Sequence, residues 1–192
     1  MGRWYARRMM EWNRTLCELV RERLAPPPGG RFLDAGFGPG NLIALVLRDL
    51  GPDGFVGGVD LSADMVRMAG RLNAAAVREG RLDLRRGDVA RLPWPDGSFD
   101  RASAVNTIYF WPDPLAGLGE LRRVLKPGGL AGIALRPRHQ MKDFPPARTE
   151  VFTLYEPEEV AGLLARAGFA APAIHARPRS GESDDVVVVA RR

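Results

Sequence analysis

Several residue types and sequence features are scarce in this chain of 192 residues, and each scarcity excludes a class of protein. Cys17 is the only cysteine, so no disulfide can form within the chain, and two histidines add too little for a zinc site. No stretch approaches the ~20 apolar residues that a membrane-spanning helix needs. The opening residues, MGRWYARRMMEW, lack the apolar segment of a signal peptide. We therefore expect a cytoplasmic protein with no metal site and no membrane partner.

Lysine is almost absent, because Lys126 and Lys142 are the only lysines among 28 basic residues. The formal net charge is +5 and the isoelectric point is about 10.1, a balance that attracts polyanions such as nucleic acids. The arginines are scattered among 23 acidic residues, and no run of five like charges occurs. This pattern favours a solvated surface and makes nucleic acid a disfavoured partner.

Helical and extended patterns alternate along the chain, which predicts a doubly wound α/β sheet. An amphipathic helix is expected over residues 3–24, and the Pro/Gly segment 25–30 ends it. The last two strands have no helix between them, so we expect an antiparallel hairpin at the sheet edge, with its turn at residues 178–183. The expected strands are residues 31–34, 55–60, 82–88, 99–106, 130–135, 171–177 and 184–192, and the further expected helices are residues 40–50, 63–80, 115–125 and 156–169.

Four of the expected strands end on a polar side chain. These side chains are Asp34, Asp60, Asp88 and Asn106. Ligands of doubly wound sheets bind at the carboxyl ends of the strands. The sequence therefore predicts a binding site that carries three acids and an amide.

The first of these strands opens a glycine-rich segment, RFLDAGFGPGN. Its glycines, Gly36, Gly38 and Gly40, form G-x-G-x-G rather than the G-x-G-x-x-G of dinucleotide-binding folds. Asp34 comes two residues earlier, where a carboxylate repels a pyrophosphate and attracts an ammonium or a sulfonium. We therefore expect a nucleoside that carries positive charge.

The other strand ends suit the same ligand. A carboxylate at Asp60 can accept both ribose hydroxyls, as in nicotinamide-binding folds. Asp88 can accept a hydrogen bond from the exocyclic amine of adenine, with the Val89 backbone near the ring, while Leu61 and Met65 offer apolar faces. An adenine, a free ribose and a cationic amino acid tail together make S-adenosylmethionine.

Five segments resemble, in order and spacing, the motifs of class I S-adenosylmethionine-dependent methyltransferases, most closely the small ubiquinone/menaquinone-biosynthesis type. The resemblance covers about residues 31–135, and it implies a Rossmann-like, mostly parallel seven-stranded sheet with a final antiparallel hairpin. It places the glycine loop at residues 34–40, the ribose acid at Asp60, the adenine acid at Asp88 and a cofactor-lining residue at Asn106. Phe37 departs from the small or polar residue that many members carry, and we expect the loop to turn its ring aside. The segments are FLDAGFGPGN, GGVDLSADMV, RRGDVARLPWPDGSFD, AVNTIYFWPDP and ELRRVLKPGGL.

The length of the chain and its pattern of elements predict a single domain, and the resemblance assigns the role of its substrate-side loop. Residues 1–30 form an N-terminal helical arm and joint, and residues 31–135 form the cofactor-binding core. Residues 136–154 form a substrate-side loop, and residues 155–192 form the C-terminal helix and hairpin. Trp4, Tyr5 and Trp12 on the arm are candidates for a lid over the cofactor.

The acceptor side of the site is less specific. Tyr109, Phe110 and Trp111 are candidates for an apolar wall, and Tyr109 and His139 are the candidate catalytic residues, His139 as a base. A methyl acceptor that is a small molecule is the leading interpretation, and S-adenosylhomocysteine would be the product. The alternatives are an RNA methyltransferase, a non-catalytic S-adenosylmethionine-binding regulator and a nicotinamide oxidoreductase. Asp34 argues against the last of these, because its carboxylate would repel the pyrophosphate of the cofactor.

Overall fold

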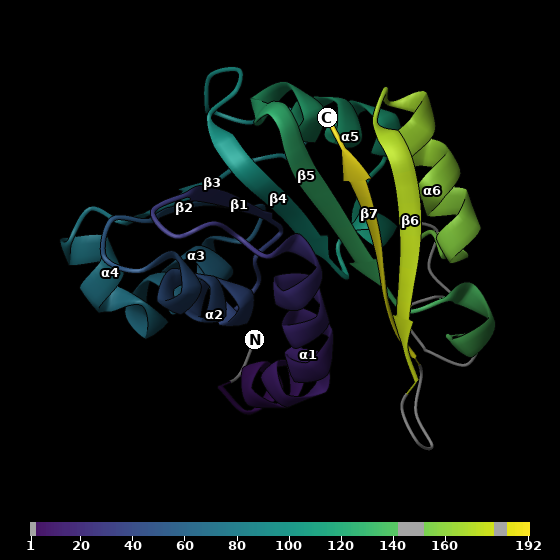
Figure 1. Ribbon diagram of the computed structural model, residues 1–192. Helices are drawn as coiled ribbons and strands as arrows, with labels where there is room; N and C mark the ends of the chain where they lie inside the picture. Colours follow the sequence, from purple (N-terminus) through teal and green to yellow (C-terminus); the bar gives the residue numbers. More distant parts are fainter. Residues whose placement is uncertain (1–2, 142–151, 179–183) are drawn as a thin grey trace.

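A single seven-stranded sheet runs through the protein, with helices on both faces (Figure 1). The computed structural model describes residues 3–141, 152–178 and 184–192, with side chains from residue 13 onward. The strand order is β3-β2-β1-β4-β5-β7-β6, and β7 is antiparallel to both of its neighbours. The strands are β1 (Arg31–Ala35), β2 (Phe55–Asp60), β3 (Leu82–Arg86), β4 (Phe99–Val105), β5 (Leu125–Leu135), β6 (Ala170–Arg177) and β7 (Asp185–Arg191).

The helices divide into two groups that cover opposite faces of this sheet (Figure 1). One core cluster joins the first three helices to the sheet, and the other joins the last two helices to it. The predicted mostly parallel, Rossmann-like α/β sheet with a C-terminal antiparallel hairpin is confirmed. The first group contains α1 (Arg3–Leu24), α2 (Asn41–Leu50) and α3 (Ala63–Leu72), with the short α4 (Ala74–Arg78) after it, and the second contains α5 (Pro114–Val124) and α6 (Pro157–Arg166).

The second half of α1 is part of the core. Leu16, Val20 and Leu24 are fully buried, and the helix contacts α2, β5 and β7. This half of the helix is therefore a fixed layer on the sheet. Any lid would have to come from the first half, and the side chains of Trp4, Tyr5 and Trp12 lie outside the described residues.

Most expected elements differ from the observed ones only by one to three residues at their ends, such as the strand expected over residues 82–88, which ends at Arg86, but two differ more. The helix expected over residues 63–80 is divided at Asn73, whose backbone N–H and side-chain amide both donate to the carbonyl of Ala69. The Pro/Gly segment after α5 was expected to separate it from a strand at residue 130, but β5 already begins at Leu125, which pairs with Phe99. The pairing shifts register between Phe99 and Arg101, so the Pro/Gly residues form an irregular start of a strand rather than a free loop.

The remaining segments connect these elements. Short 3-10 turns follow β4 and β5, at η1 (Ile108–Phe110) and η2 (Arg138–Gln140). Most of the expected hairpin turn at residues 178–183, and the middle of the expected substrate-side loop, lie outside the described residues. Within the described part of the chain, no helix is long and apolar enough to cross a membrane.

Candidate active site

A cavity of about 870 Å³ opens at the carboxyl ends of β1 to β4. Its volume lies in the ~300–1,000 Å³ range of small-molecule sites. Ten of the eleven predicted cofactor residues line this cavity, and Gly40 is the exception. The ten are Asp34, Gly36, Phe37, Gly38, Asp60, Leu61, Met65, Asp88, Val89 and Asn106. Residues from four strand ends are thus brought together, as the topology predicts.

The glycine loop is held in a conformation that favours glycine at each of its three glycine positions. Gly36, Gly38 and Gly40 have φ values of +74°, +53° and +89°. A Cβ on Gly36 would lie 2.4 Å from a methyl carbon of Thr107. Gly40 lies outside the cavity lining, where its missing side chain lets α2 begin against Ala69 of α3.

Asp60 ties the loop to the end of β2. One carboxylate oxygen accepts the Gly38 N–H at 2.9 Å, and the other accepts the Ser62 N–H at 2.8 Å. A carboxylate has about four acceptor positions, so two remain for a ligand. Asp60 therefore both shapes the loop and presents negative charge to the cavity.

Asp34 is almost completely buried, at 2% exposure, beside the cavity. Burial raises the pKa of its carboxyl group to about 7, and the nearby charge of Asp60 adds to the rise, while the hydrogen bond from the Ser103 hydroxyl at 2.9 Å opposes it. A cation placed beside this carboxyl group would restore its negative charge. The site is therefore built to gain from binding positive charge.

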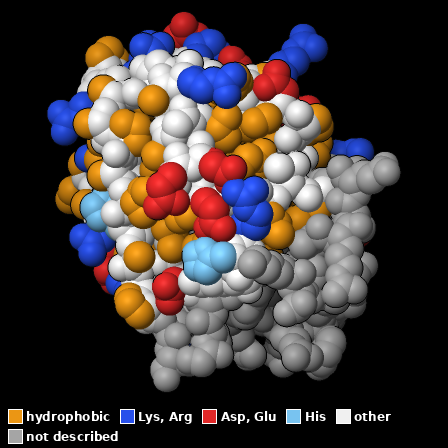
Figure 2. Space-filling model, turned by 90° about the vertical axis from the view of Figure 1, so that its right-hand side faces the viewer, with side chains coloured by type: hydrophobic (Ala, Val, Ile, Leu, Met, Phe, Trp, Pro, Cys, Tyr) orange, Lys and Arg blue, Asp and Glu red, His pale blue; other side chains and the backbone are white. Residues whose placement is uncertain are grey.

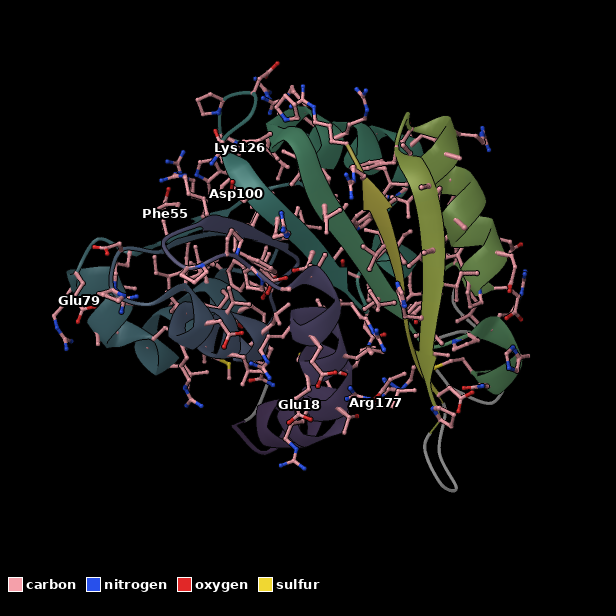
Figure 3. The ribbon with its side chains drawn as sticks, viewed as in Figure 1. Glu18, Phe55, Glu79, Asp100, Lys126 and Arg177 are labelled. Carbon is pink, nitrogen blue, oxygen red and sulfur yellow. The ribbon has the colours of Figure 1, made fainter. Side chains whose placement is uncertain are left out.

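Asp100 lies at the start of β4, at the other end of the strands from the cavity, and its carboxyl group contrasts with that of Asp34. It accepts hydrogen bonds from the Lys126 ammonium and the Arg31 N–H, both at 2.8 Å, and Figure 3 shows Lys126 beside it. Burial raises the pKa of this carboxyl group, but these partners outweigh burial and leave the pKa below its usual value. Asp100 is neutralised within the protein, whereas no described basic side chain forms an ion pair with Asp34.

The β2–β3 end of the cavity is more open. Asp88 is exposed and accepts the Ala90 N–H at 2.9 Å. Leu61 is 65% exposed although it lines the cavity, and Met65 is buried. Phe37 is also buried, with its ring packed on Gly58 of β2, so the ring forms part of the wall instead of turning away.

Asn106 and Tyr109 lie on the β4–β5 side. Asn106 has a φ of +53°, and its backbone N–H donates to the carbonyl of Ala134 at the end of β5. The Tyr109 hydroxyl accepts the Arg136 N–H at 2.5 Å and lies 3.0 Å from the carbonyl oxygen of the same residue. Burial raises the pKa of Tyr109 well above its usual value, and the charge and hydrogen bond of Arg136 only partly oppose this. A phenol in this state is poorly suited to remove a proton.

His139 is not brought to the cavity. Its exposed ring lies outside the lining, with Nδ1 2.8 Å from Glu156, and the Arg138 guanidinium pairs with Glu159 nearby. Acidic, basic and histidine side chains are intermixed on this side of the molecule, which Figure 2 shows. The position gives no support for His139 as a base. Lys142, Asp143, Arg148 and Glu150 of the expected substrate-side loop lie outside the described residues.

Several lining residues were missed by sequence reasoning. Asn13 and Cys17 reach the cavity from α1, and their spacing of four residues places them on one helix face. Burial raises the pKa of the Cys17 thiol to about 12, with the charge of Asp34 as the next cause. Met141 and Phe152 flank the acceptor side, and the Phe152 ring stacks on Tyr109 at 4.9 Å. Among the described residues, no cluster of three metal-ligating side chains is present.

The chain is similar to known methyltransferases over most of its length. The family model of the methyltransferase domain matches residues 33–133. The uncharacterized methyltransferase YdaC of Bacillus subtilis is 31% identical over 140 residues, which are 73% of this chain and 74% of that protein. The demethylmenaquinone methyltransferase of Symbiobacterium thermophilum is 37% identical over 122 residues, 62% of this chain and 46% of its own length.

The fold is shared with solved structures at lower sequence identity. A SAM-dependent methyltransferase from Aquifex aeolicus has a TM-score of 0.77 at 21% identity, with 98% of each chain covered. This chain spans less than half the length of the menaquinone methyltransferase above and of the 2-phytyl-1,4-naphtoquinone methyltransferase of Synechococcus elongatus, which is 39% identical over 113 residues. A methyltransferase-domain model matches about half of the chain, the Bacillus subtilis relative is matched over more than two thirds of both chains, and the fold is shared. Together these findings show that the chain belongs to the class I S-adenosylmethionine-dependent methyltransferase family.

Proposed function

We propose that this enzyme transfers the methyl group of S-adenosylmethionine to a small, largely apolar acceptor that enters the same cavity. The observation that carries the proposal is the composition of the cavity. Carboxylates lie at the ends of β1 to β3, and aromatic and thioether side chains close the side beyond β4. The residues on that apolar side are Tyr109, Phe110, Trp111, Met141 and Phe152.

The polar side fits the cofactor in a definite order. The strand order places Asp88, Asp60, Asp34 and Asn106 in sequence along the sheet edge, with about 4.8 Å between neighbouring strands. We assign Asp88 to the adenine amine, Asp60 to the ribose hydroxyls and buried Asp34 to the cationic tail. Leu61, Met65 and Val89 would pack against the adenine, Gly36, Phe37 and Gly38 would form the loop beneath the nucleoside, and Gly40 would act indirectly by holding α2.

The protein's part in catalysis is then mainly alignment. When bound, S-adenosylmethionine would supply an electrophilic methyl group: the acceptor's nucleophilic atom would bond to the methyl carbon in line as the carbon–sulfur bond breaks, with S-adenosylhomocysteine as the leaving group. Asp34 and Asp60 hold one side of the cavity, and the aromatic wall holds the acceptor, so the two reactants share one orientation. Alignment of this kind contributes up to ~7–11 kcal/mol. We propose Tyr109 as part of that wall, without a role as a base.

The acceptor class is suggested by the relatives and by the wall. Two relatives are named as methyltransferases of naphthoquinone or menaquinone precursors. Phe110 is 52% exposed and meets Phe152 edge to face at 4.9 Å, so an aromatic surface reaches from the cavity to solvent. A planar aromatic acceptor suits such a surface.

Calorimetry with S-adenosylmethionine, S-adenosylhomocysteine and NAD tests the cofactor. Micromolar binding of the first two with no binding of NAD supports the proposal, and binding of NAD alone contradicts it. Transfer of labelled methyl groups to quinols, phenols and amines, with total RNA in parallel, then tests the acceptor. The isoelectric point of about 10.1 favours RNA as the second candidate, and label in RNA alone would select it.

A further inference from the structure

Three polar side chains form a hydrogen-bonded chain across one end of the cavity. Asn13 of α1 accepts the side-chain N–H of Asn106 at 3.0 Å. The hydroxyl of Tyr109 donates to the side-chain oxygen of Asn106 at 3.2 Å and shares this one proton with the carbonyl oxygen of Arg136 at 3.0 Å. The chain therefore links α1 to the turn after β4, and all three residues line the cavity.

The Tyr109 end of this chain is firmly anchored. The ring is 3% exposed and stacked on Phe152, and the hydroxyl meets both backbone polar groups of Arg136, which directly follows β5. The Arg136 side chain is itself fully buried, 3.6 Å from Asp185 at the start of β7. Tyr109 is thus fixed to the central strands of the sheet.

The Asn13 end is anchored by helix packing. Leu16, one turn further along α1, is fully buried in the core that contains β5 and β7 residues, and Cys17 on the same face is 4% exposed. The backbone of Asn106 is held as well, since its left-handed conformation is followed by Thr107, which packs on Gly36. Both partners and the backbone therefore favour one orientation of the Asn106 amide.

These hydrogen bonds use only part of the hydrogen-bonding capacity of the Asn106 side-chain amide. An asparagine side chain has two N–H groups and two lone pairs on its carbonyl oxygen. Asn13 takes one N–H and Tyr109 takes one lone pair, so one donor and one acceptor remain. An amino acid tail carries an ammonium, which needs an acceptor, and a carboxylate, which needs a donor.

We propose that Asn13 and Tyr109 are positioning residues that orient the Asn106 amide so that its free N–H and its free lone pair meet the amino acid tail of the cofactor. This inference rests on the proposed function for its ligand, while the orientation itself is a property of the ligand-free protein. Under this proposal, α1 also contributes to cofactor affinity, through Asn13.

Variants of Asn13 test the direction of the hydrogen bond in which Asn106 donates and Asn13 accepts. Asn13→Ala removes the partner and should raise the Kd of both S-adenosylmethionine and S-adenosylhomocysteine about 3- to 10-fold, as the loss of one orienting hydrogen bond does. Asn13→Asp keeps an acceptor for the Asn106 N–H and should bind S-adenosylhomocysteine within about twofold of the wild type. A purely electrostatic role for residue 13 would instead change the ratio of the two Kd values. The matched control is Arg14→Ala, an exposed neighbour on the same helix.

The side-chain amide signals of Asn106 in the ¹⁵N-labelled, ligand-free protein give a readout that needs no cofactor. Asn106→Asp identifies them. We expect slow hydrogen exchange of one N–H in the wild type and in Asn13→Asp, and fast exchange in Asn13→Ala. Tyr109→Phe should shift the same signals with Asn13 intact, and a thermal melt will show whether that variant remains folded.

The outcomes separate the two proposals. Unchanged signals and Kd values in Asn13→Ala would overturn the positioning role, and equal losses in Asn13→Ala and Asn13→Asp would overturn the proposed orientation. A wild type with the expected amide signals but no affinity for either cofactor form would leave the orientation in place, remove its assigned ligand and contradict the proposed function.

Discussion

Asp34 is a residue whose burial is costly to the ligand-free protein. Its pKa is raised to about 7 in the folded state, against 3.8 for an exposed aspartate, so the folded protein binds the proton more tightly than the unfolded chain. The free energy of unfolding should therefore fall as pH rises from about 4 to about 7. The loss of stability is complete above about pH 7, where it amounts to at most about 4 kcal/mol.

Asp34→Asn removes this titration and keeps an acceptor for Ser103. We expect the variant to be more stable than the wild type at pH 8, to show little difference at pH 4, and to bind S-adenosylmethionine more weakly. Urea unfolding at the two pH values, together with calorimetry at pH 8, measures these effects. A variant less stable at pH 8 would show that an unidentified partner neutralises the carboxylate.

Asp60 combines two roles, and its removal should affect both. Asp60→Ala loses the acceptors of the Gly38 and Ser62 N–H groups along with the proposed ribose contact. We expect cofactor affinity to fall by about 1–3 kcal/mol. Asp60→Asn keeps an acceptor oxygen, so its cofactor affinity should fall less than that of Asp60→Ala. Calorimetry on the folded variants decides, and unchanged affinity in Asp60→Ala would remove this residue from the site.

The glycine loop allows a prediction at the level of an element. Gly36 and Gly80 have similar φ values, +74° and +68°, but only Gly36 has neighbours where a Cβ would be placed. Gly80→Ala should cost about 1 kcal/mol from backbone strain. Gly36→Ala should cost ~1–3 kcal/mol more, because Thr107 must move as well. Equal losses in urea unfolding would show that Thr107 yields without cost.

A second element-scale prediction concerns the junction of β5 and β7. Arg136 and Asp185 are both fully buried and 3.6 Å apart where these strands meet. Removing one charge leaves the other buried, so Asp185→Ala should reduce the free energy of unfolding by about 3–5 kcal/mol. The double variant Arg136→Met, Asp185→Leu should recover most of that loss, and thermal or urea unfolding of both variants will show whether it does.

The elements differ in how far sequence predicts them. The places of Asp34 and Asp60 at the ends of β1 and β2, and of Asp88 two residues beyond β3, were predictable because each follows an extended pattern and precedes a turn, loop or helix signal. The start of β5 at Leu125 was not, because pairing with Phe99 depends on the neighbouring strand and overrides the local Pro/Gly signal. The division at Asn73 also depends on a side-chain hydrogen bond that a helical pattern does not reveal.

The site shows the same limit. Side chains at strand ends follow from topology, so the polar half of the cavity could be predicted. Asn13 and Met141 come from segments far from the motifs, and only the packing of α1 and of the chain after β5 brings them to the cavity. His139 looked suitable by residue type alone, but its partner is Glu156 at the surface.

At the scale of the whole molecule, many of the arginines whose side chains the structure describes are bound to other groups of the protein. Arg123 binds Glu120 and Asp96, Arg177 binds Glu22, and Arg101 donates to the carbonyl of Leu24. These contacts leave the net charge at +5, but they leave fewer guanidinium groups free to bind phosphates. We expect any retention of bulk RNA at 50 mM salt to be lost by about 200 mM. Retention that survives in a filter-binding titration would favour the RNA candidate.

The position of β7 between β5 and β6 has a consequence for biosynthesis. As the chain leaves the ribosome, β5 and β6 are both made before the strand that joins them, and until residues 185–191 emerge each presents an unpaired edge. Exposed edges of this kind are where nascent chains pair wrongly with one another. The sheet is therefore completed from within, and only after residue 191 has been made. A ribosome stalled before residue 185 would carry a nascent chain in which β5 and β6 are not joined and α1 lacks its contacts with β7.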